Sequence, residues 1–383
     1  MDNLKIIADE NIPYVSECFG HLGEIQLLSG RNITAQVLEN ADVMLIRSIT
    51  KVDSALLAGS AVKFVATATI GTDHVDLDYL NSHKIGFASA PGSNANSVAE
   101  YVIAGILEIC EKKHISLQDK SLGIIGVGNV GSRLEKKAKA LGLKVILNDP
   151  PLARLKNDPK YVPLEKLFDC DFISLHVPLT YDGIDKTFHL ADENFFNSLK
   201  KGTVIINTSR GAVIDTKVVS KANKVGAIFF DVWENEPNID ISVLKIAQIG
   251  TFHIAGYSFD GKINGLIMVY NAVCKHFNLE RKFTAESFLP PPKVSEIRLN
   301  TKEANHQSLI HEAVKKVYDI TADDKNLRQV ISEPENCGRI FDKLRKEYPV
   351  RREFQNTKII LEPFDKVLAE RFIGIGFKVE NDR

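Results

Sequence analysis

Three short segments of the sequence hold residue types that could act together on a hydroxy acid. They contain Arg210, Glu236 and His253. Oxidation of a hydroxy acid needs a cation that binds the carboxylate, a base that removes the hydroxyl proton, and a group that orients the base. Each residue also has an ordinary alternative, because an arginine can pair with a surface acid, a glutamate can lie in a solvated turn, and a histidine can be satisfied in the core.

The three segments lie where strands should end. They span residues 207–211, 231–237 and 253–257, and the first two follow the apolar runs Val204–Ile206 and Ala227–Asp231. The carboxyl ends of strands in an open α/β sheet face the ligand crevice. Side chains from these segments could therefore converge.

A glycine-rich turn precedes these segments. Ser121–Gly131 reads SLGIIGVGNVG, with Gly126, Gly128 and Gly131 in a GxGxxG pattern. The first glycine permits a tight turn, the second lets the backbone approach a pyrophosphate, and the third lets helix and strand pack closely. The helix N-terminus would offer free N–H groups to the phosphates. A simple strand–helix turn is the alternative, but the flanking strand and helix patterns favour a dinucleotide site.

Asp149 ends the next apolar run. A carboxylate there would bind ribose hydroxyls and repel a 2′-phosphate, which favours NAD over NADP. The alternative is a turn residue in front of Pro150 and Pro151.

Short apolar runs alternate with helical patterns along most of the chain, which predicts parallel sheets built from βαβ units. The turn-rich stretch Ala90–Asn94 precedes a long apolar helix that reaches about Cys110. Besides the two runs above, the expected strands are Lys5–Ala8, Val43–Ile46, Phe64–Ala66, Leu122–Ile125, Lys144–Leu147 and Phe172–Leu175.

Three consecutive prolines, Pro290–Pro292, cannot continue a helix and predict an extended linker. Beyond them an amphipathic helix is expected from Leu309 to Ile320, and strands at Lys358–Leu361 and Gly376–Val379. The tail is therefore expected to be a separate small α+β domain.

Composition sets the broad class. A chain of 383 residues predicts two or three domains, and a net charge of −1 gives no field that favours nucleic acid or an anionic membrane. Five cysteines without a CxxC pair argue against a disulfide framework and a zinc site, and they fit a reducing cytoplasm. The sequence shows no signal peptide and no membrane-spanning apolar stretch, so a cytoplasmic protein is expected.

Taken in order, these motifs carry a family resemblance. The sequence resembles the D-isomer-specific 2-hydroxyacid dehydrogenases from about Asp9 to Asn278. The resemblance implies that Arg210 clamps the carboxylate and carbonyl, that His253 is the acid/base, and that Glu236 is its partner. It also implies NAD as the cofactor and no metal.

The resemblance further implies two doubly wound parallel-sheet domains, with a Rossmann NAD domain inserted into the substrate domain. The expected substrate domain comprises residues 1–93 and 254–284, and the NAD domain comprises residues 94–253. A C-terminal α+β dimerisation domain is expected at residues 285–383.

Further segments match one branch of the family, which acts on a phosphorylated sugar acid in pyridoxal phosphate synthesis. The branch has a C-terminal dimerisation domain that most relatives lack, and it implies a homodimer. The matching segments are residues 9–14 (DENIPY), 47–52 (RSITKV), 67–76, 253–257 (HIAGY), 341–346 and 351–353.

Carried over position by position, the resemblance implies substrate contacts at Ser48, Thr69 and Tyr257, with Arg47 beside them. Thr208 and Ser209 stand where the family is expected to have Ala and Cys, and Val177 replaces a hydroxyl residue, so only a contact through the Val177 backbone would survive. The implied cofactor contacts are Gly126, Gly128, Asn129, Val130, Gly131, Asp149, Val177, Thr208, Ser209, Arg210, Asp231 and Gly256.

The tail leaves two interpretations open. Arg339–Phe354 is rich in basic residues, which fits a solvated helix with internal ion pairs. Alternatively, Arg345, Arg351 or Arg352, of the same or of the partner subunit, approaches the substrate phosphate, which needs cations. The apolar stripe from Leu309 to Ile320 is expected to serve subunit assembly.

Two other functions remain as alternatives. One is a dehydrogenase for glycerate or phosphoglycerate, against which the 47–52 block and the tail argue. The other is an NAD-sensing binding protein on the same fold, against which the joint presence of Arg210, Glu236 and His253 argues.

Overall fold

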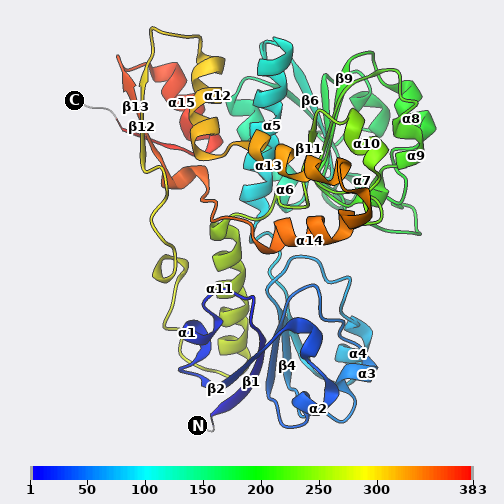
Figure 1. The fold of residues 1–383 in the computed structure, drawn as a ribbon, viewed down its shortest axis with the longest axis vertical. Coiled ribbons are helices and arrows are strands. Elements are labelled where there is room, and N and C mark those ends of the chain that lie inside the picture. The colour runs from blue at the N-terminus through cyan, green and yellow to red at the C-terminus, as the bar shows by residue number, and fades with distance from the viewer. Residues whose placement is uncertain (1–2, 381–383) are drawn as a thin grey trace. The chain divides into compact units, whose positions relative to one another are not determined.

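A computed structural model describes residues 3–380, whose backbone forms two compact units (Figure 1). The first unit combines the chain up to Asn94 with Ser258–Pro290. The second combines Ala95–Tyr257 with the chain from Pro291 onward. The glycine-rich segment and the tail therefore belong to the same unit.

The first unit contains a parallel five-stranded sheet of order β2-β1-β3-β4-β5. One apolar cluster joins the sheet to the helix α11, and a second joins it to α2, α3 and α4, so helices cover both faces. The elements are β1 (Leu4–Asp9), α1 (Val15–Phe19), β2 (Gly23–Leu28), α2 (Ala35–Leu38), β3 (Val43–Ile46), α3 (Ser54–Leu57), β4 (Phe64–Thr67), α4 (Leu77–Ser82), β5 (Gly86–Ala88) and α11 (Phe259–His276).

The second unit contains a parallel six-stranded sheet of order β11-β10-β9-β8-β6-β7. The strand order reverses between β6 and β8, and ligands bind at such a switch point in open α/β sheets. Its elements are α5 (Ala95–Lys113), β6 (Ser121–Ile125), α6 (Asn129–Ala140), β7 (Lys144–Asn148), α7 (Pro150–Lys156), β8 (Phe172–Leu175), α8 (Glu193–Ser198), β9 (Thr203–Asn207), α9 (Thr216–Val219), β10 (Val225–Phe230), α10 (Ile241–Ile246) and β11 (Ile249–Gly250).

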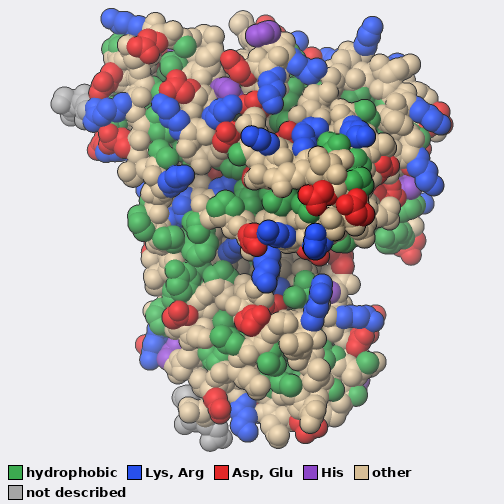
Figure 2. Space-filling model, in the orientation of Figure 1, with side chains coloured by type: hydrophobic (Ala, Val, Ile, Leu, Met, Phe, Trp, Pro, Cys, Tyr) green, Lys and Arg blue, Asp and Glu red, His purple; other side chains and the backbone are tan. Residues whose placement is uncertain are grey.

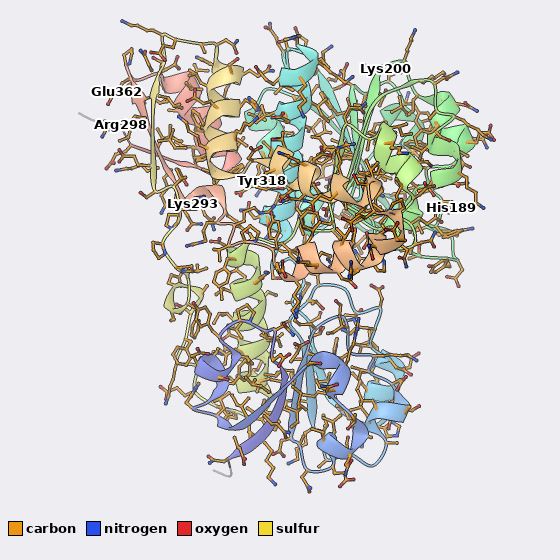
Figure 3. All side chains as sticks on the ribbon, in the orientation of Figure 1. His189, Lys200, Lys293, Arg298, Tyr318 and Glu362 are labelled. Carbon is orange, nitrogen blue, oxygen red and sulfur yellow. The ribbon has the colours of Figure 1, made fainter. Side chains whose placement is uncertain are left out.

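The tail adds a parallel three-stranded sheet, of order β12-β13-β14, and four helices to the second unit. The outward face of this sheet is charged, and Arg298 and Glu362 form an ion pair there at 2.6 Å (Figure 3). The elements are β12 (Glu296–Asn300), α12 (His306–Val317), α13 (Ile320–Leu327), α14 (Cys337–Lys346), β13 (Lys358–Glu362), α15 (Lys366–Ile375) and β14 (Lys378–Glu380).

The predicted helix from Leu309 to Ile320 is wrong at its C-terminal end. The helix α12 ends at Val317, and Asp319 caps a new helix, α13, by accepting a hydrogen bond from the Thr321 N–H. The apolar stripe is also buried within the subunit, because α12 and α13 pack beside α5 (Figure 1). This stripe therefore does not serve subunit assembly; its buried residues are Leu309, Ile310, Ala313, Val314 and Ile320.

Polar contacts fasten the tail to α5. The Glu108 carboxylate accepts from His311 at 2.8 Å, and the Glu100 carboxylate accepts from the Phe354 N–H at 3.0 Å. Nη2 of the buried Arg351 donates to the Ser97 hydroxyl of α5 at 2.6 Å, and its guanidinium also lies 4.4 Å from the ring centre of Tyr318 of the tail, a side chain labelled in Figure 3. Since these partners are buried, removing the tail would leave unpaired polar groups and an uncovered apolar face on α5.

All five cysteines are buried as free thiols. Within residues 3–380 no helix is both long enough and apolar enough to cross a membrane.

Candidate active site

The three predicted catalytic residues line one pocket of about 210 Å³. A cavity of about 750 Å³ lies elsewhere in the same unit, beside α12, but it contains none of these three residues. We place the candidate site in the smaller pocket, because size alone supplies no chemistry. Its lining is Leu179, Arg210, Gly211, Ala212, Val232, Trp233, Glu234, Asn235, Glu236 and His253.

His253 and Glu236 form a hydrogen-bonded pair. The Nδ1 of His253 lies 2.7 Å from Oε2 of Glu236, and Oε1 of Glu236 accepts from the Trp233 N–H at 2.8 Å. An ionised carboxylate only accepts hydrogen bonds, so Nδ1 carries the proton in the neutral ring. Nε2 then keeps its lone pair and can accept a proton from a substrate hydroxyl.

The surroundings of Glu236 favour its ionised form. Burial raises the pKa of this carboxyl group, but the charge and hydrogen bond of His253 lower it more, together with the Trp233 N–H and the charge of Arg345. The net pKa lies below the ordinary value for glutamate, so the group is ionised at neutral pH. A charged Glu236 in turn stabilises the imidazolium form of His253.

We predict that Glu236→Gln moves the acidic limb of the kcat/KM–pH profile to lower pH. The base must be unprotonated to act, and the amide no longer stabilises its protonated form. Steady-state rates from acidic to neutral pH measure the shift. A uniform loss at every pH, with the limb in place, would contradict the coupling.

Hydrogen bonds close the turn that runs from Asn207 to Arg210. The Asn207 side chain accepts from the N–H and the hydroxyl of Ser209, at 3.0 and 2.7 Å, and donates to the Arg210 carbonyl at 3.0 Å. Nη1 of Arg210 donates to the Ser209 carbonyl at 2.9 Å. A Cβ at Gly211 would lie 1.9 Å from the Trp233 backbone, so only glycine lets the two catalytic segments approach this closely.

Asp231 organises the loop that carries His253. Its buried carboxylate accepts from the Thr251 hydroxyl at 2.6 Å and from the N–H groups of Ile254 and Ala255 at 2.8 and 2.9 Å. The His253 backbone has a φ of 60°, which is unusual for a residue with a Cβ. These bonds hold the loop in that conformation, and the predicted direct cofactor contacts of Asp231 and the neighbouring Gly256 stay predictions.

The glycine-rich turn lies at the switch point between β6 and β8. Gly126 has a φ of +86°, and a Cβ there would lie 2.6 Å from the His176 carbonyl. A Cβ at Gly131 would lie 2.1 Å from the Gly126 carbonyl, so helix and strand pack closely. At Gly128 no described atom lies within 4 Å of the corresponding position, which leaves room for a phosphate beside the N-terminus of α6.

Asp149 has the local role of a turn residue as well as a position suited to a ribose. One carboxylate oxygen caps α7 by accepting from the Leu152 N–H at 2.9 Å. The other accepts from the Val127 N–H in the glycine-rich turn at 2.8 Å. A carboxylate has about four acceptor positions, so two hydrogen bonds leave capacity for ribose hydroxyls.

His176 is a positioning residue that sequence reasoning did not identify. It follows β8, and its ring contacts the Ser174 hydroxyl at 2.8 Å through Nε2 and the Thr208 hydroxyl at 3.1 Å through Nδ1. Burial lowers the pKa of His176 to about 3, so the ring is neutral. It thereby fixes Thr208, a predicted cofactor contact; its position at a strand end was the available signal.

The predicted substrate residues belong to different units. Arg47 and Ser48 follow β3 and Thr69 follows β4, all within the first unit, whereas Tyr257 belongs to the second. The Thr69 hydroxyl lies 2.7 Å from that of Thr67. The neighbouring Lys51 is already paired with Asp53 at 2.9 Å, and Lys51 is largely exposed.

Two sequence families match the chain. The family described as "D-isomer specific 2-hydroxyacid dehydrogenase, NAD binding domain" matches residues 95–255. A "domain of unknown function" matches residues 288–374.

Whole-length relatives include the erythronate-4-phosphate dehydrogenases of Serratia proteamaculans and Escherichia coli. Both are 41% identical over 98% of this chain, and the matches cover 99% and 98% of those proteins. A D-lactate dehydrogenase of Aquifex aeolicus, solved with NAD and lactic acid, has a TM-score of 0.58 and 27% identity over 72% of this chain and 95% of its own. An NAD⁺-bound 3-phosphoglycerate dehydrogenase of Entamoeba histolytica has a TM-score of 0.61 and 25% identity over 75% of this chain and 100% of its own.

Proposed function

We propose a function from the premise that this chain belongs to the erythronate-4-phosphate dehydrogenases, within the D-isomer specific 2-hydroxyacid dehydrogenase family. The chain is an NAD-dependent dehydrogenase. It oxidises 4-phospho-D-erythronate to 2-oxo-3-hydroxy-4-phosphobutanoate, a step of pyridoxal 5′-phosphate synthesis. The pocket that joins Arg210, Glu236 and His253 supports the dehydrogenase chemistry, and the whole-length relatives support the substrate.

Each of the three pocket residues has its own role in the reaction. His253 accepts the C2 hydroxyl proton at Nε2, and Glu236 orients the ring and stabilises its positive charge. Arg210 holds the C1 carboxylate and polarises the C2 oxygen through its planar guanidinium. When bound, NAD would supply the acceptor for the hydride that leaves C2.

The remaining contacts follow from the same reaction. Gly126–Gly131 and the N-terminus of α6 would hold the cofactor pyrophosphate, and Asp149 would hold its ribose. Asn207 and His176 hold Thr208–Arg210, which would contact the cofactor together with Val177. Ser48, Thr69, Arg47 and Tyr257 contact the substrate.

A turnover assay of the purified protein tests this function. NADH formation should be fast with 4-phospho-D-erythronate and NAD, and far slower with unphosphorylated erythronate, glycerate or 3-phosphoglycerate. A preference for glycerate or 3-phosphoglycerate would show that the enzyme acts on another class of substrate. Cofactor binding without turnover of any hydroxy acid would support a binding protein instead.

We predict that NAD is used at least about tenfold more efficiently than NADP, because the Asp149 carboxylate repels a 2′-phosphate. Asp149→Asn keeps an oxygen that can cap α7 but removes the charge, so the ratio of the two kcat/KM values should fall. Asp158→Asn is the matched control outside the ribose position. Equal efficiency of both cofactors in the unmodified protein would rule out the assignment.

The proposal includes a cytoplasmic homodimer assembled through the tail. The stripe on α12 is buried inside the subunit, but Phe364, Val367 and Ile373 of the tail are exposed apolar residues that a partner copy could cover. Sedimentation equilibrium of the full chain measures the assembly. Deleting the tail is a poor test, because the deletion would uncover α5.

A further inference from the structure

The helix α14 of the tail is fixed against the catalytic segment at its N-terminal end. A Cβ at Gly338 would lie 2.6 Å from Oδ1 of Asn238 and 3.4 Å from Cγ of Pro237. The Cys337 thiol lies 3.7 Å from the Pro237 carbonyl. Pro237 directly follows the catalytic Glu236, so the start of α14 has little freedom relative to the active site.

Aromatic side chains fix the other end. Tyr348 lies just beyond α14, and its ring meets those of Phe252 and Tyr257 edge-on, each with a centroid distance of 5.9 Å. Its hydroxyl donates to the buried Asp323 at 2.9 Å. Phe252 and Tyr257 flank His253 in sequence, so both ends of α14 contact the catalytic segments.

Arg345 lies in the last turn of this helix. Its guanidinium is 5.4 Å from the ring centre of Tyr257, a proposed substrate contact. Its charge also acts on Glu236. The Nε is buried and has no hydrogen-bond partner among the residues that the structure describes. A buried N–H without a hydrogen-bond partner destabilises the protein, so we expect a bound ligand to accept the hydrogen bond of this Nε.

The other two candidate arginines of the tail have structural roles. Nη2 of the buried Arg351 donates to the Ser97 hydroxyl and to the Ala255 carbonyl, each at 2.6 Å. Nη2 of Arg352 donates to the Asn356 side chain at 2.7 Å. The sequence could not choose among the three arginines, and these contacts leave Arg345 as the candidate.

The substrate carries an anionic group that can accept the hydrogen bond of the Arg345 Nε. Its two anionic groups are the C1 carboxylate and the C4 phosphate, and Arg210 is assigned to the carboxylate. A phosphate carries up to two charges and prefers arginine as its partner. Figure 2 shows Lys and Arg side chains gathered over α14, where Lys343 and Lys346 are exposed and Arg345 is half-buried.

We propose that Arg345 binds the 4-phosphate of the substrate from the same subunit that carries Arg210 and His253, so the tail takes part in substrate selection. This inference rests on the proposed function. The Tyr257 ring lies beside the guanidinium, and Nε with one Nη offers two parallel donors that can bind an anion.

The test compares Arg345→Ala with the unmodified chain on 4-phospho-D-erythronate and on unphosphorylated erythronate. We expect KM for the phosphorylated substrate to rise about 10- to 100-fold, with kcat changed little, because a charged hydrogen bond is lost. The slow oxidation of erythronate should stay within about twofold, since it has no phosphate to bind. Arg345→Lys should fall between the two, because it keeps the charge but not the planar fork.

Arg339→Ala is the matched control, because Arg339 is an exposed arginine of the same helix. The KM of Arg339→Ala for 4-phospho-D-erythronate should not change. An equal loss of efficiency on both substrates for Arg345→Ala, with a shifted pH profile, would overturn the proposal and show that Arg345 acts only through Glu236. No change on either substrate would also overturn it.

A second measurement keeps this inference separate from the proposed function. Inorganic phosphate should raise the Tm of the unmodified chain and of Arg339→Ala, but raise it less in Arg345→Ala. If the unmodified chain fails to oxidise 4-phospho-D-erythronate, the proposed function fails, and the thermal shift still tests the anion site. Equal Tm shifts in all three proteins would show that Arg345 does not bind the anion.

Discussion

Replacing His253 by asparagine is expected to lower kcat by about 10²- to 10⁴-fold while NAD still binds. Asparagine is close to the imidazole in shape at Nδ1 and can still donate to Glu236. It offers no basic nitrogen at the position of Nε2, so the hydroxyl proton has no acceptor. Single-turnover NADH formation, together with NAD binding by calorimetry, separates the lost chemistry from lost affinity.

His189→Asn is the matched control for this change. His189, which is labelled in Figure 3, also contacts a glutamate, with its Nε2 3.0 Å from Glu234. It does not line the pocket. Its replacement should leave kcat nearly unchanged. If His253→Asn turned over at a near-normal rate, the base would have to be another group.

The second large effect is expected for Arg210→Lys, which should lower kcat/KM by about 10²- to 10³-fold. Lysine keeps the positive charge but cannot hold a carboxylate and the C2 oxygen with one planar group. The Asn207 turn should survive, because it bonds to the Arg210 backbone rather than to its side chain. Initial rates with varied substrate at saturating NAD measure the change.

Arg154→Lys is the control for the same substitution at the surface, where Arg154 pairs with Asp185. A surface pair contributes little, so that variant should keep its efficiency. Wild-type efficiency in Arg210→Lys would mean that a point charge suffices and that the clamp geometry is wrong.

The sequence predicted the central strands well, but it missed four of the edge strands, β2, β5, β11 and β12. Runs such as Val43–Ile46 and Phe172–Leu175 are buried on both faces, and such strands are continuously apolar. The missed strands β2 and β12 alternate or mix polar and apolar residues, as GEIQLL and EIRLN. Half-exposed edges bury too little apolar surface to be distinguished from loops by composition.

The candidate site was predicted because its residues follow strand ends and carry family motifs. Its supporting contacts were not, because they join distant parts of the chain. Arg351 bonds to Ser97 and Ala255, and Thr251 bonds to Asp231, and no local pattern marks these pairs. The apolar stripe of α12 was assigned to assembly for a related reason, since a buried helix face looks the same whichever surface covers it.

Arg351 has a consequence for how the protein is made. Its Nη2 also donates to the Ile254 carbonyl, 97 residues earlier in the chain and next to His253. At translation rates of about 5–20 residues per second, Arg351 would be synthesised roughly 5–20 seconds after Ile254. A nascent chain therefore has all its catalytic residues, and the Asp231 contacts to their loop, well before the contacts that Arg351 adds from the tail. Prematurely terminated products would lack these contacts, and we expect them to be inactive and readily degraded.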